Sequence, residues 1–143
     1  GLERGIDNLQ IYLMCEIPSN VIEADKFSEY IDGISIGGND LLQLTLGIDR
    51  DSEKLQTITD HTNVSYRRMI AKAIEDYGKH HVKVGFCGQQ PSDSIEFCEF
   101  LVKSGIDSIS VTSDSAFNID LHRTGIPQRI KSKNFPEDQT AYS

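Results

Sequence analysis

Apolar residues along this chain recur at two different spacings, and the alternation between them predicts strands that are each followed by helical segments. Short β-prone runs occupy residues 9–14, 34–36, 82–86 and 107–111. The clearest helical stripe steps by three and one residues and consists of Tyr66, Met69, Ile70, Ala73, Ile74 and Tyr77. Weaker stripes follow Ser19, a candidate N-cap, and Pro91, whereas residues 41–62 are expected to form a long connection.

This order of elements predicts an α/β domain with parallel strands, because a helix returns the chain to the same edge of the sheet before each new strand. Two architectures are compatible with it: an open doubly wound sheet, and part of an eight-stranded barrel that four βα units cannot close alone. No low-complexity linker divides the chain, so residues 1–130 are expected to form one domain. A weak final helix is expected from residue 113, and the polar residues 131–143 are expected to form a flexible tail.

The composition narrows the classes of function. The 143 residues include 14 Lys and Arg against 22 Asp and Glu, a formal net charge of −8, and such a surface repels phosphate backbones. We therefore expect no nucleic-acid partner, and no membrane partner either, since no apolar run approaches the ~20 residues of a membrane helix. The three cysteines have no CxxC spacing, which argues against a disulfide framework or a zinc site and fits a reducing cytoplasm.

The candidate catalytic and metal-binding residues lie where the predicted strands end. Parallel α/β folds bind their ligands at this edge of the sheet. Glu16 follows the first strand, and Asn39 and Asp40 follow the second. Cys87 and Gly88 follow the third strand. Two carboxylates would suit Mg²⁺, which takes one or two protein carboxylates and completes its shell with water and substrate. The alternative is that both carboxylates cap the turns that follow them.

Two other features of this edge have both a chemical and a structural interpretation. Gly37-Gly38 would let the backbone approach a ligand closely, or would form a plain turn from strand to helix. Cys87 has a glycine close by on each side, which favours a catalytic role for its thiol. The alternative is a structural role, because an isolated free cysteine is more often part of a core. Cys15 and Cys98 lie on an apolar strand and on a helical stripe, so both are expected to be core residues.

Three segments resemble motifs of the phosphoenolpyruvate-utilising enzymes, in the family's order and at family-like intervals. They are LMCEIPSN at residues 13–20, DGISIGGNDLLQLTLGIDR at 32–50 and VGFCGQQPSD at 84–93. MCEIPSN together with TLGIDRD is most similar to the phosphoenolpyruvate synthase (pyruvate, water dikinase) branch. The resemblance implies a (β/α)8 barrel that binds pyruvate or phosphoenolpyruvate, of which this chain would be the second half, strands five to eight.

The resemblance also implies roles for the residues at the strand ends. Glu16 and Asp40 match the two magnesium ligands of the family. Asn39 matches an amide that contacts the substrate, and Gly88 matches backbone that approaches it. Cys87 matches the acid/base that moves a proton at the methyl carbon of pyruvate.

The chain departs from the family pattern near these residues. Gly38, which would also lie beside the substrate, stands where the family usually has Ser or Thr. Gln90 is bulkier than the small residue often found at its position, and Thr112-Ser113 replaces a common Asn-Pro.

In the family, the enolate oxygen of pyruvate takes a phosphoryl group from a phosphohistidine domain that an ATP-binding domain charges. Those two domains are therefore the expected partners, and the enzyme would be a phosphotransferase. Neither domain is recognisable in this chain, which begins at Gly1 rather than Met. We expect a piece of a longer enzyme that is inactive alone and covers its open sheet edges either by forming a homodimer or by rearranging its termini.

Two other functions stay open. The departures and the missing half of the barrel would fit a non-catalytic remnant that serves as an interaction or structural module. A stand-alone magnesium-dependent lyase acting on pyruvate would need only the residues at this one edge.

Overall fold

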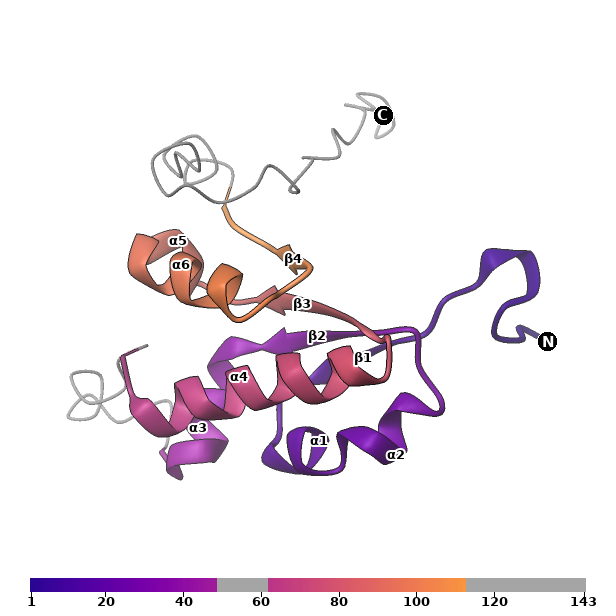
Figure 1. The fold of residues 1–143 in the computed structure, drawn as a ribbon, viewed down its shortest axis with the longest axis horizontal. Coiled ribbons are helices and arrows are strands. Elements are labelled where there is room, and N and C mark those ends of the chain that lie inside the picture. The colour runs from indigo at the N-terminus through magenta and orange to yellow at the C-terminus, as the bar shows by residue number, and fades with distance from the viewer. Residues whose placement is uncertain (49–61, 113–143) are drawn as a thin grey trace, which may run out of the picture.

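The computed structural model describes residues 1–48 and 62–112 and contains one sheet of four parallel strands (Figure 1). The strands lie in chain order and are β1 (Tyr12–Cys15), β2 (Gly33–Gly37), β3 (Lys83–Cys87) and β4 (Ser108–Ile109). The predicted α/β fold with parallel strands is therefore confirmed. The expected final helix from residue 113 and the expected tail at residues 131–143 lie outside the described residues.

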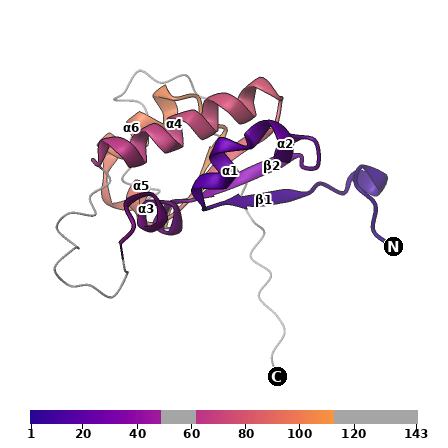
Figure 2. The ribbon, with the colours of Figure 1, turned by 90° about the horizontal axis from the view of Figure 1, so that it is seen from below.

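The helices that connect the strands cover one face of the sheet. Figure 2 shows four of them on the same side of the strands: α1 (Pro18–Ile22), α2 (Ala24–Ser28), α4 (Val64–Lys79) and α6 (Ile95–Lys103). Ile34 and Ile36 on β2 and Val84 and Phe86 on β3 point toward these helices and are almost fully buried. The alternating residues of the same strands point to the other side, as the two-residue period of a strand requires.

The other side of the sheet is covered by none of the described helices, and we call it the open face. It carries Tyr12, Met14, Gly33, Ser35, Gly37, Lys83, Gly85, Cys87 and Ser108. Tyr12 and Met14 are 50% and 42% exposed, and their side chains lie across glycines of β2. A Cβ on Gly33 would overlap the Tyr12 ring, and one on Gly37 would lie 3.3 Å from the Met14 Cε.

The long connection expected after β2 is wrong for its first part, because residues Gly38–Leu46 form helix α3. Leu41 and Leu42 are buried in the core, so this segment has the apolar face that a helix needs. Gly47 ends the helix with a left-handed φ of 64°. Gly37 ends β2 and Gly38 begins this helix, which agrees with one of the two interpretations of these glycines, a turn from strand to helix. The remainder of that connection, at residues 49–61, lies outside the described residues.

The helical segments after β1 and β3 are each broken once. Glu23 (φ −103°, ψ 31°) separates α1 from α2, and Ser94 separates α5 (Gln90–Asp93) from α6. Ser94 caps α6, since its side chain accepts from the Phe97 N–H. The expected cap at Ser19 is wrong, because α1 already begins at Pro18, a residue well suited to the first helical position.

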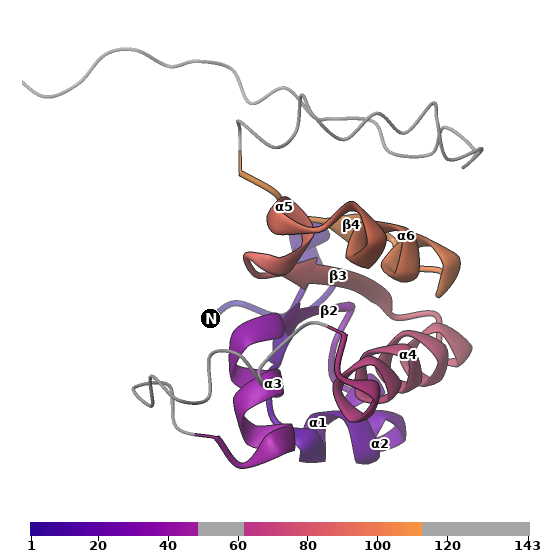
Figure 3. The same cartoon turned by 90° about the vertical axis from the view of Figure 1, so that its left-hand side faces the viewer.

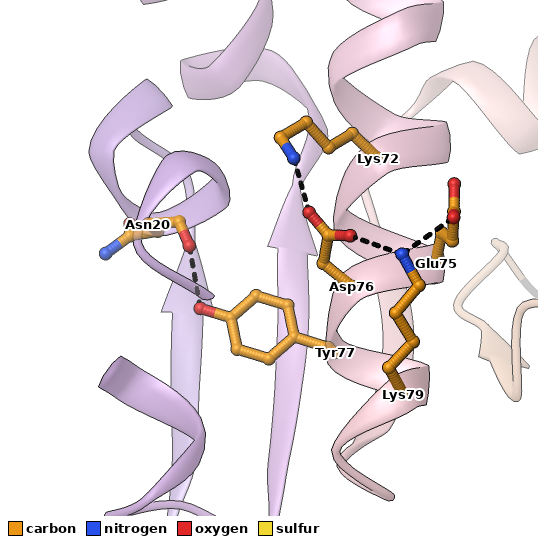
Figure 4. Close-up of polar contacts among 6 residues, drawn as sticks. All are labelled: Asn20, Lys72, Glu75, Asp76, Tyr77 and Lys79. Atoms are coloured by element: carbon orange, nitrogen blue, oxygen red, sulfur yellow. Dashed lines mark hydrogen bonds and ion pairs between the residues drawn. The ribbon is translucent and has the colours of Figure 1, made fainter. Parts of the chain in front are cut away.

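A buried hydroxyl links two neighbouring helices of the layer. The Tyr77 hydroxyl on α4 donates to the backbone carbonyl of Asn20 on α1 at 2.8 Å, and both residues are buried (Figure 4). On the exposed side of α4, Asp76 pairs with Lys72 and Lys79. These ion pairs lie within α4 and contribute little to stability, so of these contacts only the tyrosine hydrogen bond ties α4 to α1.

Tyr77→Phe should therefore lower the free energy of unfolding of the chain by about 1–2 kcal/mol, because it leaves a buried carbonyl without its donor. Urea denaturation followed by far-ultraviolet circular dichroism would measure the change. Tyr30→Phe removes the same atom from a side chain that is 69% exposed and should leave stability within about 0.5 kcal/mol. Equal effects of the two substitutions would contradict the importance of the buried hydrogen bond.

Candidate active site

The carboxyl ends of the first three strands bring a carboxylate, a glycine and a thiol into one row. Cys15 pairs with Ile36, so Glu16 follows level with Gly37, and Gly37 pairs with Cys87. Figure 3 looks at this edge, where α3 and α5 begin. Neighbouring strands lie about 4.8 Å apart, so the first and third members of the row are separated by roughly twice that distance.

Gly37 is required by the close approach of Glu16. A Cβ at Gly37 would lie 2.8 Å from the Glu16 Cβ and 3.0 Å from its Oε2, which is too close for a real side chain. The carboxylate of Glu16 thus lies over Gly37 on the open face rather than at the start of α1. Of the two sequence-based interpretations, the capping role for Glu16 is wrong. The place that a side chain at Gly37 would take is thus filled by the side chains of Glu16 and Met14.

Asn20 holds the loop that carries Glu16, and the sequence analysis missed this role. Its Oδ1 accepts hydrogen bonds from the backbone N–H groups of Glu16 and Ile17, both at 3.3 Å. Asn20 is only 6% exposed, and its own carbonyl accepts from Tyr77. An asparagine that comes shortly after a strand end and follows Pro18 could have signalled such a side-chain turn.

Asn39 and Asp40 lie in the first turn of α3, at the same edge of the sheet, and both are exposed. The start of the helix is fixed by Tyr66, whose hydroxyl donates to the Gly38 carbonyl at 3.0 Å. Burial raises the pKa of Tyr66, so the hydroxyl stays protonated and remains a donor. The Asn39 Oδ1 accepts from the Gln90 Nε2 at 2.8 Å.

Gly38 and Gly88 come close to each other where β2 and β3 end. A Cβ at Gly88 would lie 3.5 Å from the Gly38 Cα. A Cβ at Gly38 would lie 2.5 Å from the Phe86 ring and 2.8 Å from the Gln90 Oε1. In this structure, the side chains of Phe86 and Gln90 therefore fill the space that the two glycines leave open.

The fourth strand contributes backbone contacts to this edge. The Ser110 N–H donates to the Phe86 carbonyl at 2.9 Å, and the Thr112 N–H donates to the Ser92 hydroxyl at 3.0 Å. Ser113 lies outside the described residues. Arg67 on α4 pairs with Glu96 on α6 at 2.9 Å and lies over the Phe100 ring.

With this geometry established, comparison with known proteins identifies the family. Residues 3–125 match the family described as PEP-utilising enzyme, PEP-binding domain. The chain belongs to this family. The phosphoenolpyruvate synthases of Synechocystis sp., Helicobacter pylori and Aquifex aeolicus are 56%, 54% and 50% identical to it over 115 residues. That length is 80% of this chain but 13–14% of those proteins, so the chain spans about one-seventh of the curated relatives it matches.

The predicted magnesium ligands of this PEP-binding domain have suitable chemistry. Glu16 and Asp40 supply hard carboxylate oxygens after adjacent parallel strands, and Mg²⁺ takes only one or two such ligands. Within residues 1–48 and 62–112, no group of three or more His, Cys, Asp or Glu residues is placed to hold a metal ion. The magnesium site therefore stays a prediction that rests on two residues.

The three cysteines of the domain differ in exposure, in the order that the sequence predicts. Cys15 and Cys98 are buried, and Cys87 is partly exposed. Burial, and to a smaller extent the charge of Glu16, raises the pKa of Cys15 to about 12. Burial also raises the pKa of Cys98, whose Sγ donates to the Pro91 carbonyl at 3.2 Å. Two thiols are thus both covered and held in their unreactive form.

Thiol alkylation should consequently distinguish the cysteines in the native chain. With iodoacetamide near pH 7, Cys87 should react at least about tenfold faster than Cys15 or Cys98, because the thiolate is the reactive species and a raised pKa depletes it. Peptide mass mapping over a time course would give the three rates. Labelling after denaturation, where all three should react alike, provides the control. Protection of Cys87 in the native chain would contradict its placement at an accessible site.

In the part of the chain that the structure describes, no helix combines the length and the apolar character that crossing a membrane would need.

Proposed function

We propose that this chain is the pyruvate- and phosphoenolpyruvate-binding part of a phosphoenolpyruvate synthase. The whole protein would convert ATP, pyruvate and water to AMP, phosphoenolpyruvate and phosphate. The observation that carries the proposal is the row of Glu16, Gly37 and Cys87 at one edge of the sheet, with Asn39 and Asp40 beside it. The 41–56% identity to several phosphoenolpyruvate synthases supports the same assignment.

The proposal includes a fold larger than this chain, namely a (β/α)8 barrel of which the chain supplies the second half. Three features support it over a doubly wound sheet. The strands follow one another in chain order, whereas a doubly wound sheet reverses its order at a switch point. The helices α1, α2, α4 and α6 lie on one face. The open face, with its glycines and serines, is the side that would line the barrel interior.

The residues in the row would share the chemistry of enolisation. In the direction of phosphoenolpyruvate synthesis, Cys87 would accept a proton from the methyl carbon of pyruvate, and the electron pair would move to the carbonyl oxygen. That oxygen would then take the phosphoryl group from a phosphohistidine on another domain of the protein. Asn39 would donate a hydrogen bond to the substrate. Glu16 and Asp40 would hold the Mg²⁺, which when bound supplies positive charge to the developing enolate.

An assay of the whole protein that contains this chain would test the proposal. Purified protein with ATP, pyruvate and Mg²⁺ should form AMP and phosphoenolpyruvate in equal amounts, and chelation of the metal should stop both. The isolated chain should form neither. Pyruvate-dependent turnover without AMP, or magnesium-dependent exchange of the methyl protons of pyruvate by the isolated chain, would instead favour a stand-alone lyase. Assembly into a homodimer stays a prediction.

A further inference from the structure

The side chain of Gln90 occupies an unusual position between two glycines. Its Oε1 lies 2.8 Å from the place where a Cβ would stand on Gly38, and 2.5 Å from the corresponding place on Gly88. A side chain at either glycine would overlap this carboxamide. The Gln90 amide is therefore fixed in a cradle formed by the residues that directly follow β2 and β3.

From this cradle Gln90 makes one directed hydrogen bond, from its Nε2 to the Asn39 Oδ1 at 2.8 Å. The two residues are 51 positions apart in the chain and belong to the first turns of α3 and α5. Since the carbonyl oxygen of Asn39 is bonded to Gln90, the Nδ2 of Asn39 is directed away from Gln90. Asn39 is exposed, so its N–H donors face the solvent at the edge where the substrate would bind.

Folding stability alone would not favour a glutamine carboxamide in this position. The Gln90 Oε1 is buried and has no hydrogen-bond partner among the described residues. A buried carbonyl without a donor is destabilising, whereas an apolar side chain of the same length would leave no such atom. The hydrogen bond to Asn39 is the interaction that the glutamine makes and an apolar residue could not.

We infer that Gln90 is a positioning residue that holds the Asn39 carboxamide by its oxygen and so presents the amide N–H donors to an acceptor oxygen of pyruvate. This inference rests on the proposed function, and it names which end of Asn39 meets the substrate. The two glycines take part by leaving room for the Gln90 carboxamide. Gly38 and Gln90, which both depart from the usual family pattern, thus form one interdependent pair.

The kinetic test uses Gln90→Met in the whole protein, because methionine keeps the length of the side chain and removes the hydrogen bond. The KM for pyruvate should rise about three- to tenfold, the range that one lost hydrogen bond implies, while the KM for ATP stays unchanged. The matched control is Gln89→Met. Gln89 is exposed, and its Nε2 donates to Asp93 instead, so its replacement should change neither constant.

A double-mutant cycle separates positioning from a general structural effect. In an Asn39→Ala background, Gln90→Met should have no further effect on the KM for pyruvate, because the group that it positions is gone. Independent, additive effects of the two substitutions would overturn the inference. So would a Gln90→Met protein with the same KM for pyruvate as the unmodified protein.

A second measurement does not depend on activity. In the ¹⁵N-labelled 143-residue chain, Gln90→Met should shift the side-chain amide resonances of Asn39, and Gln89→Met should not. If the Asn39 resonances stay in place, the inference is overturned whatever the kinetics show. If they move as expected but the whole protein does not use pyruvate, the proposed function fails while the Gln90–Asn39 contact stands.

Discussion

Replacement of Cys87 by alanine in the whole protein should slow phosphoenolpyruvate formation by roughly 10²- to 10⁴-fold, the usual contribution of a general acid or base. Cys87 is the partly exposed thiol at the end of β3, beside the bare backbone of Gly37. Alanine removes the proton carrier without adding bulk to the edge. The loss should appear in the exchange of the methyl protons of pyruvate, measured by nuclear magnetic resonance in deuterated buffer.

The same variant should keep the reaction of ATP that does not involve pyruvate, since that step would belong to other domains of the protein. Cys98→Ala is the matched control: the thiol is buried against Pro91, so its loss should affect stability and spare proton exchange. If Cys87→Ala also abolishes the ATP reaction, the cause is misfolding. If it leaves proton exchange intact, Cys87 is not the acid/base.

Asp40→Asn should lower turnover of the whole protein by at least about 100-fold. Loss of a residue that only supports a metal ligand already lowers activity by up to about 100-fold, and Asp40 is proposed to be a ligand itself. Asparagine keeps the shape of the side chain but removes the charge that would bind Mg²⁺. Because Asp40 is exposed on the first turn of α3, the free energy of unfolding should stay within about 0.5 kcal/mol. Activity measured over a range of magnesium concentrations would show whether excess metal restores part of the rate.

The control for that substitution is Asp93→Asn. Asp93 is also exposed and lies in α5, the helix that follows the neighbouring strand, where it accepts from Gln89. A general effect of removing a negative charge from this edge would lower activity in both variants. Activity that survives in the Asp40→Asn protein at ordinary magnesium concentrations would remove Asp40 from the proposed metal site.

The elements that depend on short-range pattern could be predicted from the sequence. The stripe from Tyr66 to Tyr77 predicts α4, because residues three and four apart share one face of a helix. The strand ends predicted the edge that carries Glu16, Asn39 and Cys87, because parallel strands end at the same side. Helix α3 was missed because its first residue is a glycine, a residue with low helix propensity.

The contacts that support the site could not be predicted, because their partners lie far apart in the chain. The Tyr77 hydroxyl reaches a carbonyl 57 residues away, and the Tyr66 hydroxyl reaches one 28 residues away. No periodicity encodes such pairs, which arise only once the helices have packed on the sheet. For the same reason the sequence could mark Gly38 and Gln90 as unusual individually but could not show that they meet.

On the open face, the absence of a covering helix is a poor guide to which substitutions the chain can accept. Tyr12 lies across Gly33, Glu16 across Gly37, and the Ser108 hydroxyl 2.7 Å from where a Cβ would stand on Gly85. A larger residue at any of these glycines would have to displace its neighbour. The constraint is strongest at Gly37, because the nearest atom is the Glu16 Cβ, which no rotation of that side chain can move, whereas the Tyr12 ring and the Ser108 hydroxyl can rotate. Amino-acid substitutions should therefore be rarer at Gly37 than at the exposed positions of the helices.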